Sequence, residues 1–162
     1  MTNPAGTNYG ASYLDFAEVW QYLQFPAAPT GQQQNMLQRY IDSACSFAQG
    51  AQGANRPITP TEFQERHDGW SGEYILLHHC PFLQLVAGIE HQSSYGSVPL
   101  PEATPGSGID GIQIDYATGK IMRTFDGSWP KPFFPGARNI EITYIAGFNP
   151  VPPEVWEATV DL

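Results

Sequence analysis

Four histidines and one cysteine are the side chains of this sequence best suited to bind a transition metal: His67, His78, His79, Cys80 and His91. Zinc requires three or four nitrogen or sulfur ligands that converge in a tetrahedron. If the adjacent His78 and His79 lie on a strand, their side chains point to opposite faces. No second Cys-x-x-Cys or His-x-His pair occurs. We therefore expect packed or solvated histidines and no metal site.

Other patterns that would support catalysis are also weak. Asp110, Asp115 and Asp126 lack the regular spacing and the distal glutamate of a calcium loop. No nucleophile elbow occurs. The glycines of 106–111 resemble a dinucleotide-binding turn, but they precede a strand-like segment, so a phosphate would meet no helix N-terminus. We expect no catalytic residue, no cofactor and no enzymatic activity.

The segment 128–136 is rich in aromatic side chains that stand among prolines. Large apolar side chains in an exposed loop indicate a surface for a partner, and proline lowers the entropy cost of ordering such a loop. These aromatics could instead cover the edge of a sheet. We expect the partner contact to include Trp129, Pro130, Phe133 and Phe134.

A second candidate contact lies near the C-terminal end of the sequence. Pro152-Pro153-Glu154 is a typical helix start, because proline suits the first helical position. Val155 and Trp156 then share one face of a segment too short to form a stable helix alone. We expect this face to contact a partner as well.

Two further helices are predicted near the start of the sequence. Asp15 is a suitable N-cap for the first, which Pro26 would end. Thr30 and Gln33 have the spacing of a capping box for the second. The apolar residues repeat at helical spacing, with polar residues including Gln49 on the other face. We expect a core between these helices made of Phe16, Trp20, Leu37, Ile41 and Phe47.

The central part of the sequence alternates between apolar and polar residues, which is typical of antiparallel strands with one solvated face. Ala117-Thr118-Gly119 is a turn signal and predicts a hairpin. Two long loops without structure of their own are expected at 93–109 and 128–136. The expected strands lie within 59–67, 74–78, 83–90, 112–116 and 139–144, with one further strand from Ile121.

Composition limits the class of protein. The 162 residues carry a formal net charge of -9, and the seven basic residues do not cluster, which argues against direct binding to nucleic acid. Two cysteines are too few for a disulfide scaffold, so we expect reduced thiols in a protein made in the cytoplasm. We expect no signal peptide and no membrane span, because the sequence shows neither pattern.

These patterns predict an α+β fold, in which two N-terminal helices pack with a small antiparallel β-sheet and the start of a C-terminal helix. The expected organisation has four parts: a flexible N-terminal arm at 1–12, a helical part at 13–53, a β part with two long loops at 54–148, and the start of a C-terminal helix at 149–162.

Four stretches in this order resemble the head-tail connector proteins of tailed bacteriophages, also called adaptor or head-completion proteins. They are Tyr13-Leu14-Asp15, the helix Leu37–Phe47, the hairpin Ile114–Ile121, and the strand Ile140–Phe148 followed by Val151-Pro152. Each stretch is short, but the ordered set covers nearly the whole chain. Members of the family usually carry more helix after the Val-Pro start than this sequence does.

The resemblance implies a structural subunit of the virion neck. Such a subunit forms an adaptor ring of about twelve copies between the portal protein and the next neck or tail protein, a stopper or tail terminator. The ring extends the channel through which DNA passes without specific binding, and no membrane is involved.

An alternative function is a β-rich carbohydrate- or surface-binding module, because aromatic loops and low charge suit stacking on sugars. A metal-dependent enzyme is a third, weaker hypothesis.

Overall fold

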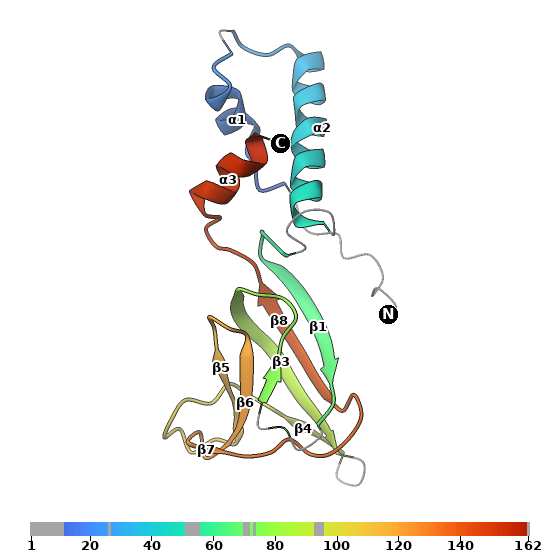
Figure 1. The fold of residues 1–162 in the computed structure, drawn as a ribbon, viewed down its shortest axis with the longest axis vertical. Helices are drawn as coiled ribbons and strands as arrows, with labels where there is room; N and C mark the ends of the chain where they lie inside the picture. The colour runs from blue at the N-terminus through green and yellow to red at the C-terminus, as the bar shows by residue number, and fades with distance from the viewer. Residues whose placement is uncertain are drawn as a thin grey trace. The chain divides into compact units, whose positions relative to one another are not determined.

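The protein has an α+β fold with the helices near the two ends of the chain and the strands between them (Figure 1). The computed structural model describes residues 12–25, 27–50, 56–69, 72, 74–92 and 96–161. The chain divides into a helical unit, Met1–Pro60 with Phe148–Leu162, and a β unit, Thr61–Gly147. Within the described residues, no helix is both long and apolar enough to cross a membrane. Nearly all of the expected arm at 1–12 lies outside them.

The first helix, α1, spans Phe16–Tyr22 and begins at the predicted cap. One carboxylate oxygen of Asp15 accepts hydrogen bonds from the backbone amides of Ala17 at 2.8 Å and Glu18 at 3.2 Å. These amides have no partner within the helix itself, so the cap stabilises the first turn. Pro26, the expected end of the helix, lies outside the described residues.

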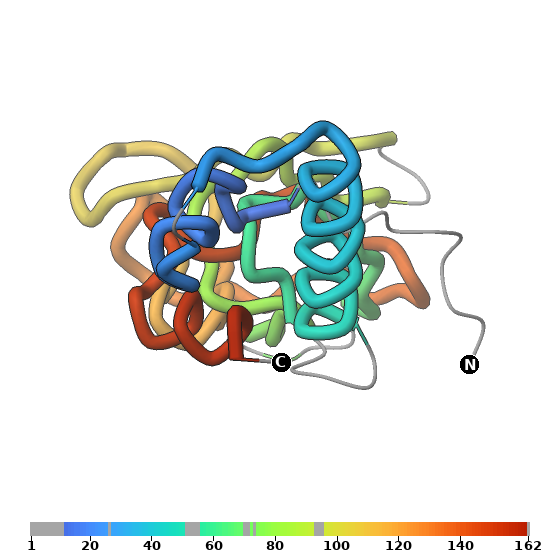
Figure 2. Tube along the Cα trace, turned by 90° about the horizontal axis from the view of Figure 1, so that it is seen from above, coloured from blue at the N-terminus to red at the C-terminus, as the bar shows by residue number. Residues whose placement is uncertain are grey.

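The second helix, α2, spans Gly31–Gln49 and begins with the predicted capping box of Thr30 and Gln33. The third, α3, spans Pro153–Val160, with proline in its first turn as expected. Figures 1 and 2 show α1 and α3 on the same side of the longer α2.

The core of the helical unit is small. Ile41 is 3% exposed, and Phe16 and Leu37 pack against the buried cluster to which it belongs, as predicted. Trp20 stacks on Phe16 with ring centroids 5.8 Å apart. Phe47, which we expected in this core, is 45% exposed. The seven residues of α1 and eight of α3 are too few to cover the apolar stripe along all 19 residues of α2. The buried members are Leu14, Val19, Ile41 and Cys45.

Gln49 also departs from the expectation, because its side chain is 1% exposed and does not face solvent. Its Oε1 atom accepts hydrogen bonds from the amides of Ile58 at 3.2 Å and Thr59 at 3.4 Å. A buried amide side chain requires such partners. The end of α2 is therefore tied to the residues that precede the first strand.

The β unit contains two antiparallel sheets. The first has the order β1-β8-β3-β4, with bounds Thr61–His67, Ile140–Ala146, Phe82–Gln92 and Gly96–Pro99. The second has the order β2-β6-β5, with bounds Tyr74–Leu76, Lys120–Phe125 and Gly111–Asp115, and the short β7, Trp129–Pro130, pairs with β6.

Strand β8 is central in the first sheet, and its inward side chains are fully buried. Ile140, Ile142 and Tyr144 are each 0% exposed, whereas the residues between them are partly exposed, as the alternating sequence predicts.

The other sheet lies close to this one: a Cβ at Gly88 of β3 would meet Ile112 of β5 at 3.5 Å and the backbone oxygen of Leu100 at 2.7 Å. Glycine at 88 allows this close approach.

The predicted hairpin is confirmed, with Asp115 paired to Lys120 across the turn and Gly119 at φ +67°. The two expected loops, in contrast, contain strands. Residues 96–99 form β4, which pairs with β3, and Trp129–Pro130 form β7. These short strands have no apolar alternation of their own and form because they pair with a neighbouring strand. The local sequence therefore did not predict them.

Candidate functional site

The aromatic segment 128–136 presents one strongly exposed side chain. Trp129 is 71% exposed, and its partner across the β6–β7 pairing, Phe125, is 55% exposed. Pro130 is exposed as well. The structure therefore places an apolar surface at Trp129, Pro130 and Phe125, and Phe125 was not singled out from the sequence.

The other two aromatics of this segment lie differently. Phe133 is 2% exposed and belongs to the core of the β unit, whereas Phe134 is partly buried. This position of Phe133 agrees with the alternative that the loop covers the edge of a sheet. A contact with a partner through the Phe133 side chain would require the loop to open.

The backbone of this segment is held by a buried carboxylate. Glu90 of β3 is 0% exposed, and its Oε1 accepts hydrogen bonds from the Phe134 amide at 2.7 Å and from Arg123 Nη1 at 2.9 Å. Arg123 also donates to the carbonyl oxygen of Pro132 at 3.3 Å. Gln92 donates to the other oxygen of Glu90 at 2.7 Å. The buried charge is thus both paired and hydrogen-bonded, as burial requires.

Asn139 holds the same segment from the other end. Its side-chain nitrogen donates to the carbonyl oxygen of Phe134 at 2.8 Å, and its side-chain oxygen accepts from the amide of Gly69 at 2.8 Å. That amide also donates to the carbonyl oxygen of Gly136 at 2.8 Å. The segment that follows Trp129 is therefore anchored at Pro132, Phe134 and Gly136.

The second candidate contact, Val155 and Trp156 of α3, is partly buried. Trp156 packs against the core of the helical unit and makes an edge-on contact with Tyr22, with ring centroids 5.3 Å apart. The hydroxyls of Tyr13 and Thr159 share a hydrogen bond of 2.6 Å, which ties α3 to the segment before α1. Trp156 therefore has a structural role within its own unit.

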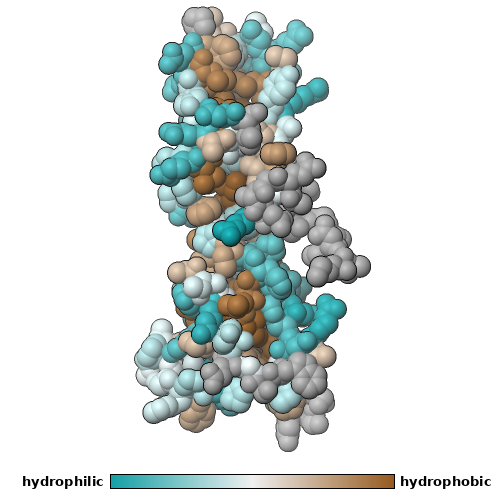
Figure 3. Space-filling view, viewed as in Figure 1, coloured by the Kyte–Doolittle hydropathy of each residue, from teal (hydrophilic) through white to brown (hydrophobic). Residues whose placement is uncertain are grey.

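The helical unit also carries an apolar groove of about 560 Å³ between α2 and the two shorter helices. Part of this apolar surface is visible over the helices in Figure 3. Its walls include Leu23, Leu37, Tyr40, Phe47 and Val160. The exposed side of Phe47 follows directly from this incomplete cover.

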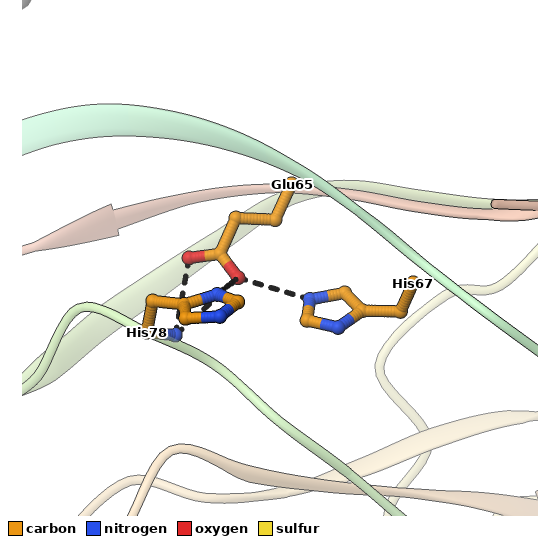
Figure 4. Close-up of side chains that lie close together, drawn as sticks. All are labelled: Glu65, His67 and His78. Carbon is orange, nitrogen blue, oxygen red and sulfur yellow. Dashed lines mark hydrogen bonds and ion pairs between the residues drawn. The ribbon is translucent and has the colours of Figure 1, made fainter. Parts of the chain in front are cut away.

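A cluster of titratable side chains lies in the β unit, where Glu65 is approached by two imidazoles (Figure 4). Glu65 Oε2 lies 2.9 Å from His67 Nε2 and 2.6 Å from His78 Nδ1. The Tyr144 hydroxyl donates to Glu65 Oε1, and the His78 amide donates to the same oxygen at 3.1 Å. Among the described residues, the side chains of Glu65, His67 and His78 could each offer one ligand atom to a metal ion, and these atoms lie within 4.8 Å of one another.

The surroundings determine the charge on this cluster. Burial alone would raise the pKa of the Glu65 carboxyl, but hydrogen bonds from His67, Tyr144 and His78 lower it to about 2. Burial and the bond to Glu65 raise the pKa of the Tyr144 hydroxyl. Burial lowers the pKa of His79, whose ring stacks on Phe63 at 3.9 Å. The Glu65 carboxylate is therefore ionised at neutral pH.

Comparison with known proteins identifies the fold. No family model matches the chain, and no curated protein matches its sequence. Among solved structures, a chain from the neck of an empty GTA (gene transfer agent) particle, computed with C6 symmetry, superposes with a TM-score of 0.60. The match covers 96% of this chain and 80% of that chain, at 18% sequence identity. The two chains share one fold.

The remaining sequence candidates are dispersed. His91 contacts the Ser97 hydroxyl at 2.9 Å, and Cys80 donates to the carbonyl oxygen of Thr118 at 3.6 Å. Asp110 accepts from the Asp126 amide at 3.0 Å, and Asp115 accepts from the Thr118 hydroxyl at 2.6 Å in the hairpin turn. The carboxylates of Asp110 and Asp115 thus accept hydrogen bonds from residues of two turns.

Sequence reasoning missed Glu65, although it had named His67 and His78. A signal was present, because Glu65 and His67 stand two residues apart on an expected strand and must share a face. The approach of His78 depends on the path of the chain between β2 and β3, which no local pattern reveals.

Proposed function

We propose that this protein is a non-enzymatic structural subunit of the neck of a tailed phage or phage-like particle. The observation that carries the proposal is the likeness to a neck chain along 96% of this sequence. The helices and strands also follow the order that was expected from the resemblance of the sequence to head-tail connector proteins. The protein would then reside in the virion.

In this role the chain is an adaptor. About twelve copies form a ring between the portal protein and the next neck or tail protein, a stopper or tail terminator. A closed ring uses heterologous contacts, in which one surface of a copy meets a different surface of the next. The symmetry reported for the neighbouring structure, C6, is compatible with a ring of copies.

The charge of the chain suits a subunit beside DNA. With a net charge of -9, it repels phosphate and releases no counterions on contact, so DNA passes through the channel without specific binding. The ring extends the channel from the portal toward the tail. The subunit acts by binding its neighbours and by shaping the channel, and it makes or breaks no covalent bond.

Contacts with other neck proteins are assigned to the exposed apolar surface at Trp129 and Pro130, and the partly buried Phe134 of the same segment is a further candidate. An anchored loop loses little entropy when it binds, and Glu90, Arg123 and Asn139 anchor this one. Val155 and Trp156 stay a second, weaker candidate, because Trp156 already packs within its own unit.

The test is a substitution in the particle itself. Trp129→Ser removes a side chain that is 71% exposed, so the free energy of unfolding should change by no more than about 0.5 kcal/mol. We expect DNA-filled heads without tails, counted by electron microscopy of lysates. Tyr74→Ser, which removes another exposed aromatic of the β unit, should leave the yield of tailed particles unchanged.

If the Trp129→Ser variant gives normal yields of infectious particles, this surface does not make the proposed contact with a neck protein. The carbohydrate-binding alternative is favoured by the same exposed tryptophan, since sugars stack on aromatic faces. A glycan array separates the two functions: a sugar-binding module binds there as a monomer, whereas an adaptor binds none and instead binds portal rings.

A further inference from the structure

Glu65, His67 and His78 are brought together by two different parts of the β unit. Glu65 and His67 lie two residues apart on β1 and therefore share a face of the first sheet. His78 lies between β2, a strand of the second sheet, and β3, a strand of the first. Figure 4 shows both imidazoles directed at the carboxylate.

Two imidazoles and one carboxylate are the ligands of open zinc sites, which keep a fourth position for water. Metal bonds of about 2.0–2.2 Å place tetrahedral ligand atoms roughly 3.3 Å apart. The Glu65 oxygen lies 2.9 Å from the His67 nitrogen and 2.6 Å from the His78 nitrogen. The carboxylate oxygen and each imidazole nitrogen would have to move apart by several tenths of an ångström to admit the ion.

The surroundings of the cluster are those of an oriented ligand set. The Tyr144 hydroxyl and the His78 amide both donate to Glu65 Oε1. Oε2 is then the oxygen directed at both imidazoles, and such outer hydrogen bonds hold metal ligands in place. The side chains of Glu65 and His67 are 11% and 13% exposed, whereas His78 is 76% exposed. Solvent thus reaches the cluster on the His78 side, where an ion can enter and a water can complete the tetrahedron.

We propose that Glu65, His67 and His78 bind one divalent transition-metal ion of the zinc type. Both imidazoles bind as neutral rings, with the proton of each moved to the nitrogen that faces away from the ion. The ion then joins β1 to the segment between β2 and β3 and so links the two sheets of the β unit. This site goes beyond the proposed neck function, and a chain that binds no zinc could still assemble into a ring.

The test uses the full chain without an affinity tag, stripped with a chelator, dialysed and titrated with Zn²⁺ by calorimetry. We expect one Zn²⁺ per chain and a higher melting temperature with Zn²⁺ present, because the ion binds the folded state. Co²⁺ in its place should give the absorption bands of a tetrahedral ion.

His78→Gln is the decisive variant, since the exposed side chain can change without unfolding the protein. Its affinity for Zn²⁺ should fall by more than the roughly 10- to 100-fold that loss of an outer hydrogen-bond partner costs. His91→Gln is the matched control: it removes an imidazole of the same unit, 45% exposed and bound to Ser97, and should leave the affinity unchanged.

Two results would overturn the proposal. One is the absence of saturable Zn²⁺ binding to the wild-type chain, which would leave the three residues as a hydrogen-bonded group only. The other is equal affinity of the wild-type chain and the His78→Gln variant, which would place the ion elsewhere.

Discussion

Glu90 is a buried carboxylate that organises the loop after β7. It is 0% exposed, and it holds both Arg123 and the amide of Phe134. A buried carboxylate without partners is costly, so these bonds fix the path of the loop as well as the charge. The exposed Trp129 thus sits at the beginning of a segment whose later residues cannot move freely.

Arg123→Met tests this arrangement. The substitution keeps much of the side-chain volume but leaves the Glu90 charge buried without its cation. We expect the free energy of unfolding to fall by about 3–5 kcal/mol, as measured by urea denaturation at neutral pH.

Lys131→Met is the control for that experiment, because it removes a cation from an exposed pair. Lys131 Nζ lies 3.4 Å from Asp110 Oδ2, and the two side chains are 38% and 49% exposed. Exposed pairs contribute at most about 1 kcal/mol. Equal losses in the two variants would show that burial of Glu90 does not set the stability of the loop.

Residues of helix α2 differ in how much they stabilise the fold, because the neighbouring helices are short. Only part of its apolar stripe is covered, so Ile41 is buried while Tyr40, the next residue back, is 65% exposed. Neighbouring positions on one helix therefore make very unequal contributions to stability.

Ile41→Ala should lower the free energy of unfolding by about 2–5 kcal/mol, because it leaves a cavity in the small core. Tyr40→Ser, on the exposed side, should change it by no more than about 0.5 kcal/mol, because serine and tyrosine have similar helix propensities. Thermal melts of both variants provide the comparison. An unchanged melting curve for Ile41→Ala would contradict the packing of α1 against α2.

The elements with strong local signals were predictable from the sequence. The Asp15 cap, the Thr30–Gln33 capping box and the hairpin turn before Lys120 each depend on residues a few positions apart. Local hydrogen bonds of this kind are encoded where they form, so a pattern of two or three residues suffices. The alternation along β8 was equally clear.

The features that depend on distant contacts were not predictable. Strand β4 pairs with the edge of β3, and β7 pairs with the end of β6 that β2 does not reach. Gln49 is buried because the residues before β1 return to it. Phe47 fits an apolar stripe in sequence but is 45% exposed. The Glu65 cluster likewise requires a path of the chain that brings residue 78 to residue 65.

At the scale of the whole molecule, the proposed function places the chain in the neck of a particle. Its fold matches that of a neck chain, its net charge is -9, and its exposed Trp129 precedes an anchored loop. The proposed adaptor role is consistent with these three features together, whereas a carbohydrate-binding module would account only for the exposed aromatic.

Electron microscopy of purified particles labelled with an antibody fragment against this chain tests the central claim most directly. The account predicts label at the junction of head and tail, in a ring of about twelve copies between the portal and the next neck protein. Label on the capsid faces or at the distal end of the tail, or its absence from particles that carry complete necks, would contradict it.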